Sequence, residues 1–141
     1  MKKITPFLWF DGKAEEAMNF YISIFKNSKI VSANRFQLDG QEFLALNGGP
    51  QFTFSPAVSF FVNCETQQKV DELWEKLSEG GEKGRCGWLK DKYGLSWQVI
   101  PSVLGEMLHD KDAEKSKRVV KAMLQMSKID VKGLQQAYDQ G

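Results

Sequence analysis

Cys86 is the side chain of this 141-residue sequence best suited to nucleophilic chemistry. Arg85 and Lys90 lie close to it in sequence, and positive neighbours lower the pKa of a thiol. Because neighbouring residues of a strand point to opposite faces, Arg85 would point away from Cys86. No histidine is close enough in sequence to act as a base. We therefore expect Cys86, like Cys64, to be a small buried side chain, with a reactive Cys86 thiol as the alternative.

His109 is the only imidazole in the chain, and an exposed or helix-capping role is the more common one for such a residue. Two cysteines do not make a disulfide framework, which favours a reducing, cytoplasmic location. The net charge of +1 gives no general attraction to nucleic acid or to a membrane surface. The apolar run at residues 4–10 is too short for a membrane span and has no small-residue cleavage site, so we interpret it as a strand.

The first half of the chain predicts a strand, a helix and further strands. The turn pair Asp39-Gly40 between strand-like flanks is a strong hairpin signal. Asn47-Gly48-Gly49-Pro50 then interrupts the pattern. The expected elements are a strand at 4–10, a helix at 13–25, a strand at 29–36, a hairpin at 37–47 and a connection at 48–56.

The second half repeats this order of element types at a period of about 55 residues. We expect a strand at 57–63, a helix at 66–79 and strands at 85–91 and 95–101. Asp91 should fix the turn at residues 92–94. The tail predicts helices at 102–108, 112–127 and 130–138. The prediction is thus an α+β fold, a single domain with module one at about 1–49, module two at about 57–101 and a helical tail at 102–141.

Several strings resemble one known family. They are Thr5 to Phe10 (TPFLWF), Ala14 to Ala17 (AEEA), Phe20-Tyr21, Leu46 to Pro50 (LNGGP) and Cys86 to Gln98 (CGWLKDKYGLSWQ). Together they resemble the PhnB-like group, which carries the label 3-demethylubiquinone-9 3-methyltransferase. That group belongs to the glyoxalase, bleomycin-resistance and extradiol-dioxygenase (vicinal oxygen chelate) superfamily. The resemblance extends over nearly the whole chain, and it implies two βαβββ modules with cupped mixed sheets in a homodimer.

The sequence departs from relatives between the second and third strands, where they usually carry a longer loop. Here Arg35-Phe36 runs directly into Gln37-Leu38. Either the chain is shorter at this point, or a loop is missing between Phe36 and Gln37. An absent loop would open one wall of the first cup.

The resemblance also implies positions for metal ligands, because enzymes of the superfamily hold a divalent ion with His and Glu from the first and last strands of each module. The matching positions are Thr5 or Pro6, Ala45, Ala57 and Gln98. None carries an imidazole or a carboxylate. We therefore expect no metal site and no cofactor, the alternative being a divalent metal held by Gln98 and other donors.

The family label suggests methyl transfer, which we do not infer from the sequence. Binding S-adenosylmethionine in the usual fold takes a strand, a Gly-rich turn and a helix. The Gly48-Gly49 pair leads into an irregular stretch and a strand instead. We interpret it as the turn between the modules.

The resembling fold places alternate strand residues in the cup. On that basis Phe43, Ala45 and Asn47 share a face, as do Ala57, Ser59 and Phe61, and Ser96, Gln98 and Ile100. The predicted ligand pocket consists of Asn47, Ser59, Phe61, Trp88 and Gln98. In the alternative, Asn47 and Gln98 only satisfy backbone groups at strand ends.

Three functions follow as hypotheses. The preferred one is a metal-free protein that binds a small aromatic or amphipathic compound, without a nucleic-acid or membrane partner. The second is an enzyme of the same superfamily that uses a metal or the Cys86 thiol on a small substrate. The third is a structural role in which side chains fill the cup and the tail mediates dimerisation.

Overall fold

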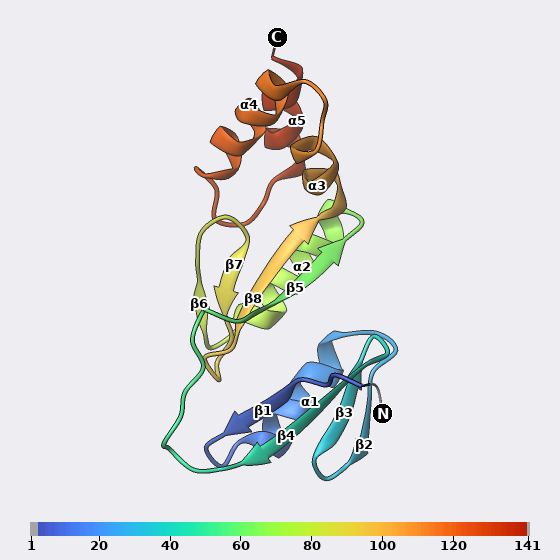
Figure 1. Ribbon diagram of the computed structural model, residues 1–141, viewed down its shortest axis with the longest axis vertical. Coiled ribbons are helices and arrows are strands. Elements are labelled where there is room, and N and C mark those ends of the chain that lie inside the picture. Colours follow the sequence, from blue (N-terminus) through green and yellow to red (C-terminus); the bar gives the residue numbers. More distant parts are fainter. Residues whose placement is uncertain (1–2, 141) are drawn as a thin grey trace. The chain divides into compact units, whose positions relative to one another are not determined.

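The computed structural model describes residues 3–140 and confirms the α+β prediction. The chain forms two compact units that divide between Phe54 and Ser55. Figure 1 shows that each unit contains a mixed sheet with a helix lying along it.

The first unit is a βαβββ module. Its strands are in the order β1-β4-β3-β2, with β1 parallel to β4 and the other pairs antiparallel. The elements are β1 Phe7–Phe10, α1 Ala14–Ile24, β2 Lys29–Ser32, β3 Arg35–Leu38 and β4 Gln41–Asn47.

The second unit repeats this topology. Its strands are in the order β5-β8-β7-β6, again with the outer parallel pair β5 and β8. The elements are β5 Ser59–Cys64, α2 Gln67–Ser78, β6 Glu82–Lys83, β7 Trp88–Lys90 and β8 Ser96–Pro101. The repeat predicted from the order of element types is therefore confirmed. The two-residue strand β6 was missed, because it directly follows the Gly80-Gly81 helix stop.

Turn chemistry accounts for the hairpins. Asp39 and Gly40 have φ values of 49° and 79°, as a two-residue hairpin turn requires, and they join β3 to β4. Cys86 and Gly87 have φ values of 57° and 85°, and Trp88 N donates to Arg85 O at 3.0 Å. Cys86 is thus in a turn, and the strand predicted at 85–91 begins only at Trp88.

The strand predicted at 29–36 is also divided, because residues 33 and 34 form a turn between β2 and β3. Phe36 and Gln37 are consecutive residues of β3, paired with Phe43 and Glu42 of β4. The strand is continuous there, so no loop is missing between Phe36 and Gln37.

The core of the first unit lies between α1 and the sheet. Tyr21 of α1 stacks on Phe36, and Phe36 stacks on Phe43 with ring centroids 5.1 Å apart. Phe43 and Ala45 are buried. The prediction that these two residues line the cup is wrong, since their face of β4 is the one that α1 covers. Alternation identifies two faces of a strand but not which of them the helix covers.

The tail is part of the second unit. Its helices are α3 Ser102–Leu108, α4 Ala113–Met123 and α5 Val131–Asp139, gathered beyond the end of β8 (Figure 1). They enclose a cluster of buried apolar side chains: Ile100, Leu104, Met107, Val119, Ile129 and Leu134. Among the helices of residues 3–140, none combines the length and the apolar character that a membrane span needs.

Candidate functional site

One face of the sheet of the second unit packs against α2. We call the opposite face the open face. α2 packs on β5, β7 and β8. Its side of the sheet carries Leu89, Trp97 and Val99, which are at most 3% exposed. Thr66 caps α2 by accepting from Lys69 N at 3.1 Å, which sets where the helix begins. The residues between these core positions therefore point to the open face.

Register places the open-face residues in two rows across the strands. One row is polar, because Ser96 of β8 pairs with Ser59 of β5 on one side and with Lys90 of β7 on the other. Lys90 in turn pairs with Glu82 of β6. The second row is aromatic and amide-bearing, with Gln98 between Phe61 and Trp88. Directly paired residues share a face, so both rows lie on the side away from α2.

A hollow of about 190 Å³ lies where the two rows approach the β6 edge. Trp88, Lys90, Ser96 and Glu82 line it, together with Pro56, Lys83, Gly84 and Leu89. Ser96 is 1% exposed, and its Oγ has no hydrogen-bond partner in the structure. A buried hydroxyl without a partner costs roughly 1–3 kcal/mol, which a ligand group placed in the hollow would recover.

The structure brings together four of the five predicted pocket residues. Ser59, Phe61, Trp88 and Gln98 share the open face, and Gln98 Nε2 donates to Ser59 Oγ at 3.0 Å. The ring of Phe61 is 59% exposed there. Glu82 and Lys90 were not predicted as site residues. If β6 had been recognised in the sequence, it would have indicated Glu82, because the pairing of β6 with β7 extends the polar row.

Asn47, the fifth predicted residue, has a structural role. Its Oδ1 accepts from Ala14 N at 2.9 Å and so caps α1 in the first unit. The alternative considered for Asn47, that it satisfies a backbone group at a strand end, is what the structure shows.

Two further residues assigned to the cup are placed otherwise. Ala57 precedes β5, and its N donates to Ser55 Oγ in the connection. Ile100 is buried with Ile129 in the tail cluster. Cys86 N and Gly87 N donate to Met126 O and Ser127 O, which holds the tail against this end of the sheet.

The two thiols and the imidazole lie in the core, in a turn and at a helix end. Cys64 is 1% exposed, and burial raises its pKa to about 11, so the thiol is protonated at neutral pH. Cys86 is partly buried in its turn. His109 Nδ1 lies 2.7 Å from Gly105 O at the end of α3, in the capping role expected for it.

A divalent metal does not fit the donors at the open face. The side chains there supply an amide, hydroxyls and the single carboxylate of Glu82, whereas hard divalent ions favour several carboxylates and borderline ions favour imidazoles. In residues 3–140 no three His, Cys, Asp or Glu side chains are grouped as metal ligands would be. We therefore derive no chemistry through a metal.

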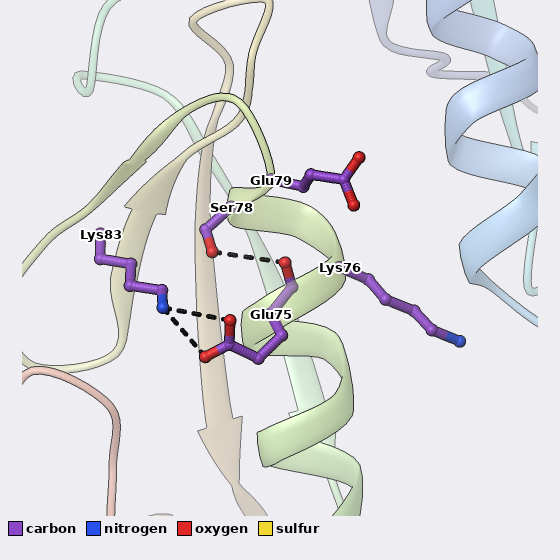
Figure 2. A pocket seen from close by; sticks show the side chains of 5 residues that line it. All are labelled: Glu75, Lys76, Ser78, Glu79 and Lys83. Atoms are coloured by element: carbon purple, nitrogen blue, oxygen red, sulfur yellow. Dashed lines mark hydrogen bonds and ion pairs between the residues drawn. The ribbon is translucent and has the colours of Figure 1, made fainter.

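A larger groove of about 320 Å³ lies between the end of α2 and β6. Both of its ammonium groups are paired, because Lys83 Nζ binds both carboxylate oxygens of Glu75, at 2.9 and 3.1 Å, and Lys76 Nζ binds Glu72 at 2.9 Å. Ser78 Oγ donates to Trp74 O at 2.6 Å. Figure 2 shows Lys76 and Glu79 pointing away from this pair. The groove offers no unsatisfied buried group, so we do not assign it a ligand.

Comparison with known proteins identifies similar sequences and folds. The family profile described as 3-demethylubiquinone-9 3-methyltransferase matches residues 2–37 and 31–100. A solved structure from Bacillus cereus, described as a putative 3-demethylubiquinone-9 3-methyltransferase, PhnB protein, is 40% identical. That match covers 72% of this chain and 100% of the other, with a TM-score of 0.68. A Pseudomonas aeruginosa protein is 18% identical over 72% of this chain and 98% of its own, with a TM-score of 0.59, which supports the fold alone.

The extent of these matches bears on the loop and the tail. The two profile segments overlap at residues 31–37, within the β2–β3 hairpin. The profile match ends at residue 100, before α3, so the similarity that we expected to include the tail is found for the part that precedes it. A search of curated proteins returned no match.

Proposed function

Because the chain belongs to the PhnB-like 3-demethylubiquinone-9 3-methyltransferase family, we propose that it binds a small molecule on the open face of its second sheet. The observation that carries the proposal is the Ser96 hydroxyl, buried without a partner in the wall of a hollow. Trp88 adds an aromatic surface, and Gln98 and Ser59 add neutral polar groups beside it. This mixture of apolar surface and few polar groups is typical of small-molecule sites.

Methyl transfer from S-adenosylmethionine is not part of the proposal. Gly48 accommodates the Trp9 indole, because a Cβ at this position would lie 2.3 Å from the ring. Trp9 Nε1 donates to Gly49 O at 2.9 Å, so the glycine pair packs and bonds with β1. No helix follows it before β5. The methyltransferase name therefore describes the Bacillus relative, and we do not infer methyl transfer for this protein from it.

A screen of small neutral aromatic compounds against the purified protein tests the proposal. Binding should perturb the Trp88 indole resonance in two-dimensional NMR spectra and raise the melting temperature. Trp88→Ala should weaken binding about 3- to 10-fold, because a ring contact contributes roughly 0.5–1.5 kcal/mol. Ser96→Ala should also weaken binding, and Ser23→Ala in α1 is the control for a lost hydroxyl, since Ser23 Oγ donates to Phe20 O outside the second unit.

Metal analysis of the same preparation distinguishes the enzyme alternative. Stoichiometric divalent metal that Gln98→Ala removes would contradict metal-free binding. Alkylation of Cys86 that abolishes a turnover would support the thiol route in its place. If no compound perturbs residues of the open face, the proposal fails and the structural role is favoured. The cytoplasmic location expected from the sequence stays a prediction.

A further inference from the structure

We propose that the hollow recognises a flat ring bearing one carboxylate, with the ring beside Trp88 and the carboxylate between Ser96 and Lys90. This inference rests on the proposed binding function and specifies the class of ligand. Its starting observation is the order of the two rows. The polar row and the aromatic row lie side by side on one face, so a ligand can contact both at once.

The spacing of the rows sets the size of the ligand. Ser96 and Gln98 are two residues apart on β8, as are Lys90 and Trp88 on β7. Two residues of an antiparallel strand span about 7 Å. That distance fits a ring joined to a carboxylate by a link of one or two carbons. A hollow of about 190 Å³ has room for such a molecule.

The charges in the polar row favour an anion. Lys90 is the direct neighbour of Ser96, and within residues 3–140 its ammonium group makes no ion pair or hydrogen bond in the structure. Lys83, the neighbouring cation of the hairpin, is instead bound to Glu75. A carboxylate near Ser96 would accept from the Ser96 hydroxyl and interact with the Lys90 ammonium, both of which suit an acceptor-only group.

Glu82 limits the charge of that anion. It pairs with Lys90 on the side away from Ser96 and lines the same hollow. A second negative charge on the ligand would be repelled by this carboxylate. The row is therefore suited to a monocarboxylate and disfavours dicarboxylates and phosphates.

Calorimetric titration with 3-phenylpropionate and with 3-phenylpropionamide tests the inference. The two probes have the same ring and link, and they differ in the charge of one end. We expect the acid to bind about 3- to 10-fold more tightly, because it alone makes a partly exposed ion pair and a charged hydrogen bond. Lys90→Gln should reduce the affinity for the acid towards that for the amide. Glu82→Gln should increase the affinity for the acid.

Lys76→Gln on α2 is the matched control, because it removes the same charge from a residue paired with Glu72 on the far side of the sheet. It should leave both affinities unchanged. Equal binding of acid and amide, or an unchanged acid affinity in Lys90→Gln, would overturn the carboxylate assignment while the binding function stands. If neither probe binds and neutral aromatic compounds also fail, both the inference and the proposed function are overturned.

Discussion

Asp91 uses both of its carboxylate oxygens inside the second unit. Oδ1 accepts from Tyr93 N at 2.8 Å and from Leu95 N at 3.1 Å, and Oδ2 accepts from Trp97 Nε1 at 2.9 Å. These bonds fix the turn between β7 and β8, and they hold the Trp97 indole on the α2 side. Because side chains alternate along β8, the same bonds direct Ser96 and Gln98 to the open face.

Asp91→Asn should lower the free energy of unfolding by about 1–3 kcal/mol, because an amide supplies one acceptor oxygen where two are needed. Its NH₂ group would face either a backbone N–H or the Trp97 N–H. Urea denaturation followed by tryptophan fluorescence measures the change. Asp11→Asn at an exposed position is the control and should change stability little. Equal stability of the two variants would contradict this role of Asp91.

Cys64 makes the free energy of unfolding depend on pH in the alkaline range. Burial raises its thiol pKa from 9.0 to about 11, so the folded state retains a proton that the unfolded state releases. The stabilisation is fully present below pH 9 and is lost as the pH rises towards 11. Over this range the wild type should lose about 1–3 kcal/mol more than Cys64→Ala.

Unfolding free energies at several pH values between 8 and about 11 check this expectation. Cys86→Ala is the control, because its thiol is partly exposed and lies in a turn. It should keep the wild-type pH dependence. A Cys64→Ala variant with the same slope as the wild type would show that the thiol does not cause it.

At the scale of elements, the tail is held to the second module by an amide and by apolar packing. Gln67 at the start of α2 donates from Nε2 to Ile129 O at 3.0 Å and accepts at Oε1 from Val131 N at 2.7 Å. Lys128 pairs with Asp71 at 2.9 Å. These contacts hold Ile129 in one buried cluster with Ile100, the residue that follows Gln98 on its face of β8. The tail therefore bounds one end of the face on which we place the ligand.

Ile129→Ala should destabilise the docked tail by about 2–4 kcal/mol, since Ile129 is fully buried and the substitution leaves a cavity. Faster proteolysis within residues 110–130 would report the undocking. Leu124→Ala is the matched control, because Leu124 is 51% exposed. Equal proteolysis of the two variants would show that this cluster does not hold the tail.

At the scale of the whole molecule, we expect a homodimer, as the family resemblance implies. The first unit offers a surface for it. β2 is an edge strand whose four residues are all exposed, and Val31 on it is 45% exposed. An unpaired strand edge with apolar side chains is prone to pair with another chain.

Sedimentation velocity of the purified protein should therefore give twice the mass of the chain. Val31→Lys should shift the equilibrium towards the monomer by placing a charge on the edge. Val58→Lys, at a residue that is 66% exposed in the connection before β5, should not. A wild-type protein that sediments as a monomer at high micromolar concentration would contradict the expectation.

Local signals in the sequence were sufficient for the elements and their repetition. The helices and the Asp39-Gly40 hairpin depend on contacts within a few residues, and period-two alternation correctly grouped Ser59 with Phe61 and Ser96 with Gln98. The identity of the covered face was not predictable in this way. α1 covers Phe43 and Ala45, and Asn47 caps that helix. These contacts join residues about 30 positions apart, so a local sequence pattern does not indicate them.

The candidate site depends on pairing between distant strands. Ser59, Ser96, Lys90 and Glu82 form one row only through the registers of four strands, and the missing partner of Ser96 follows from their packing. Sequence patterns specify which residues share a strand face, since alternation is a property of the chain itself. Which strands are neighbours, and which polar group is left unsatisfied between them, is decided by non-local packing.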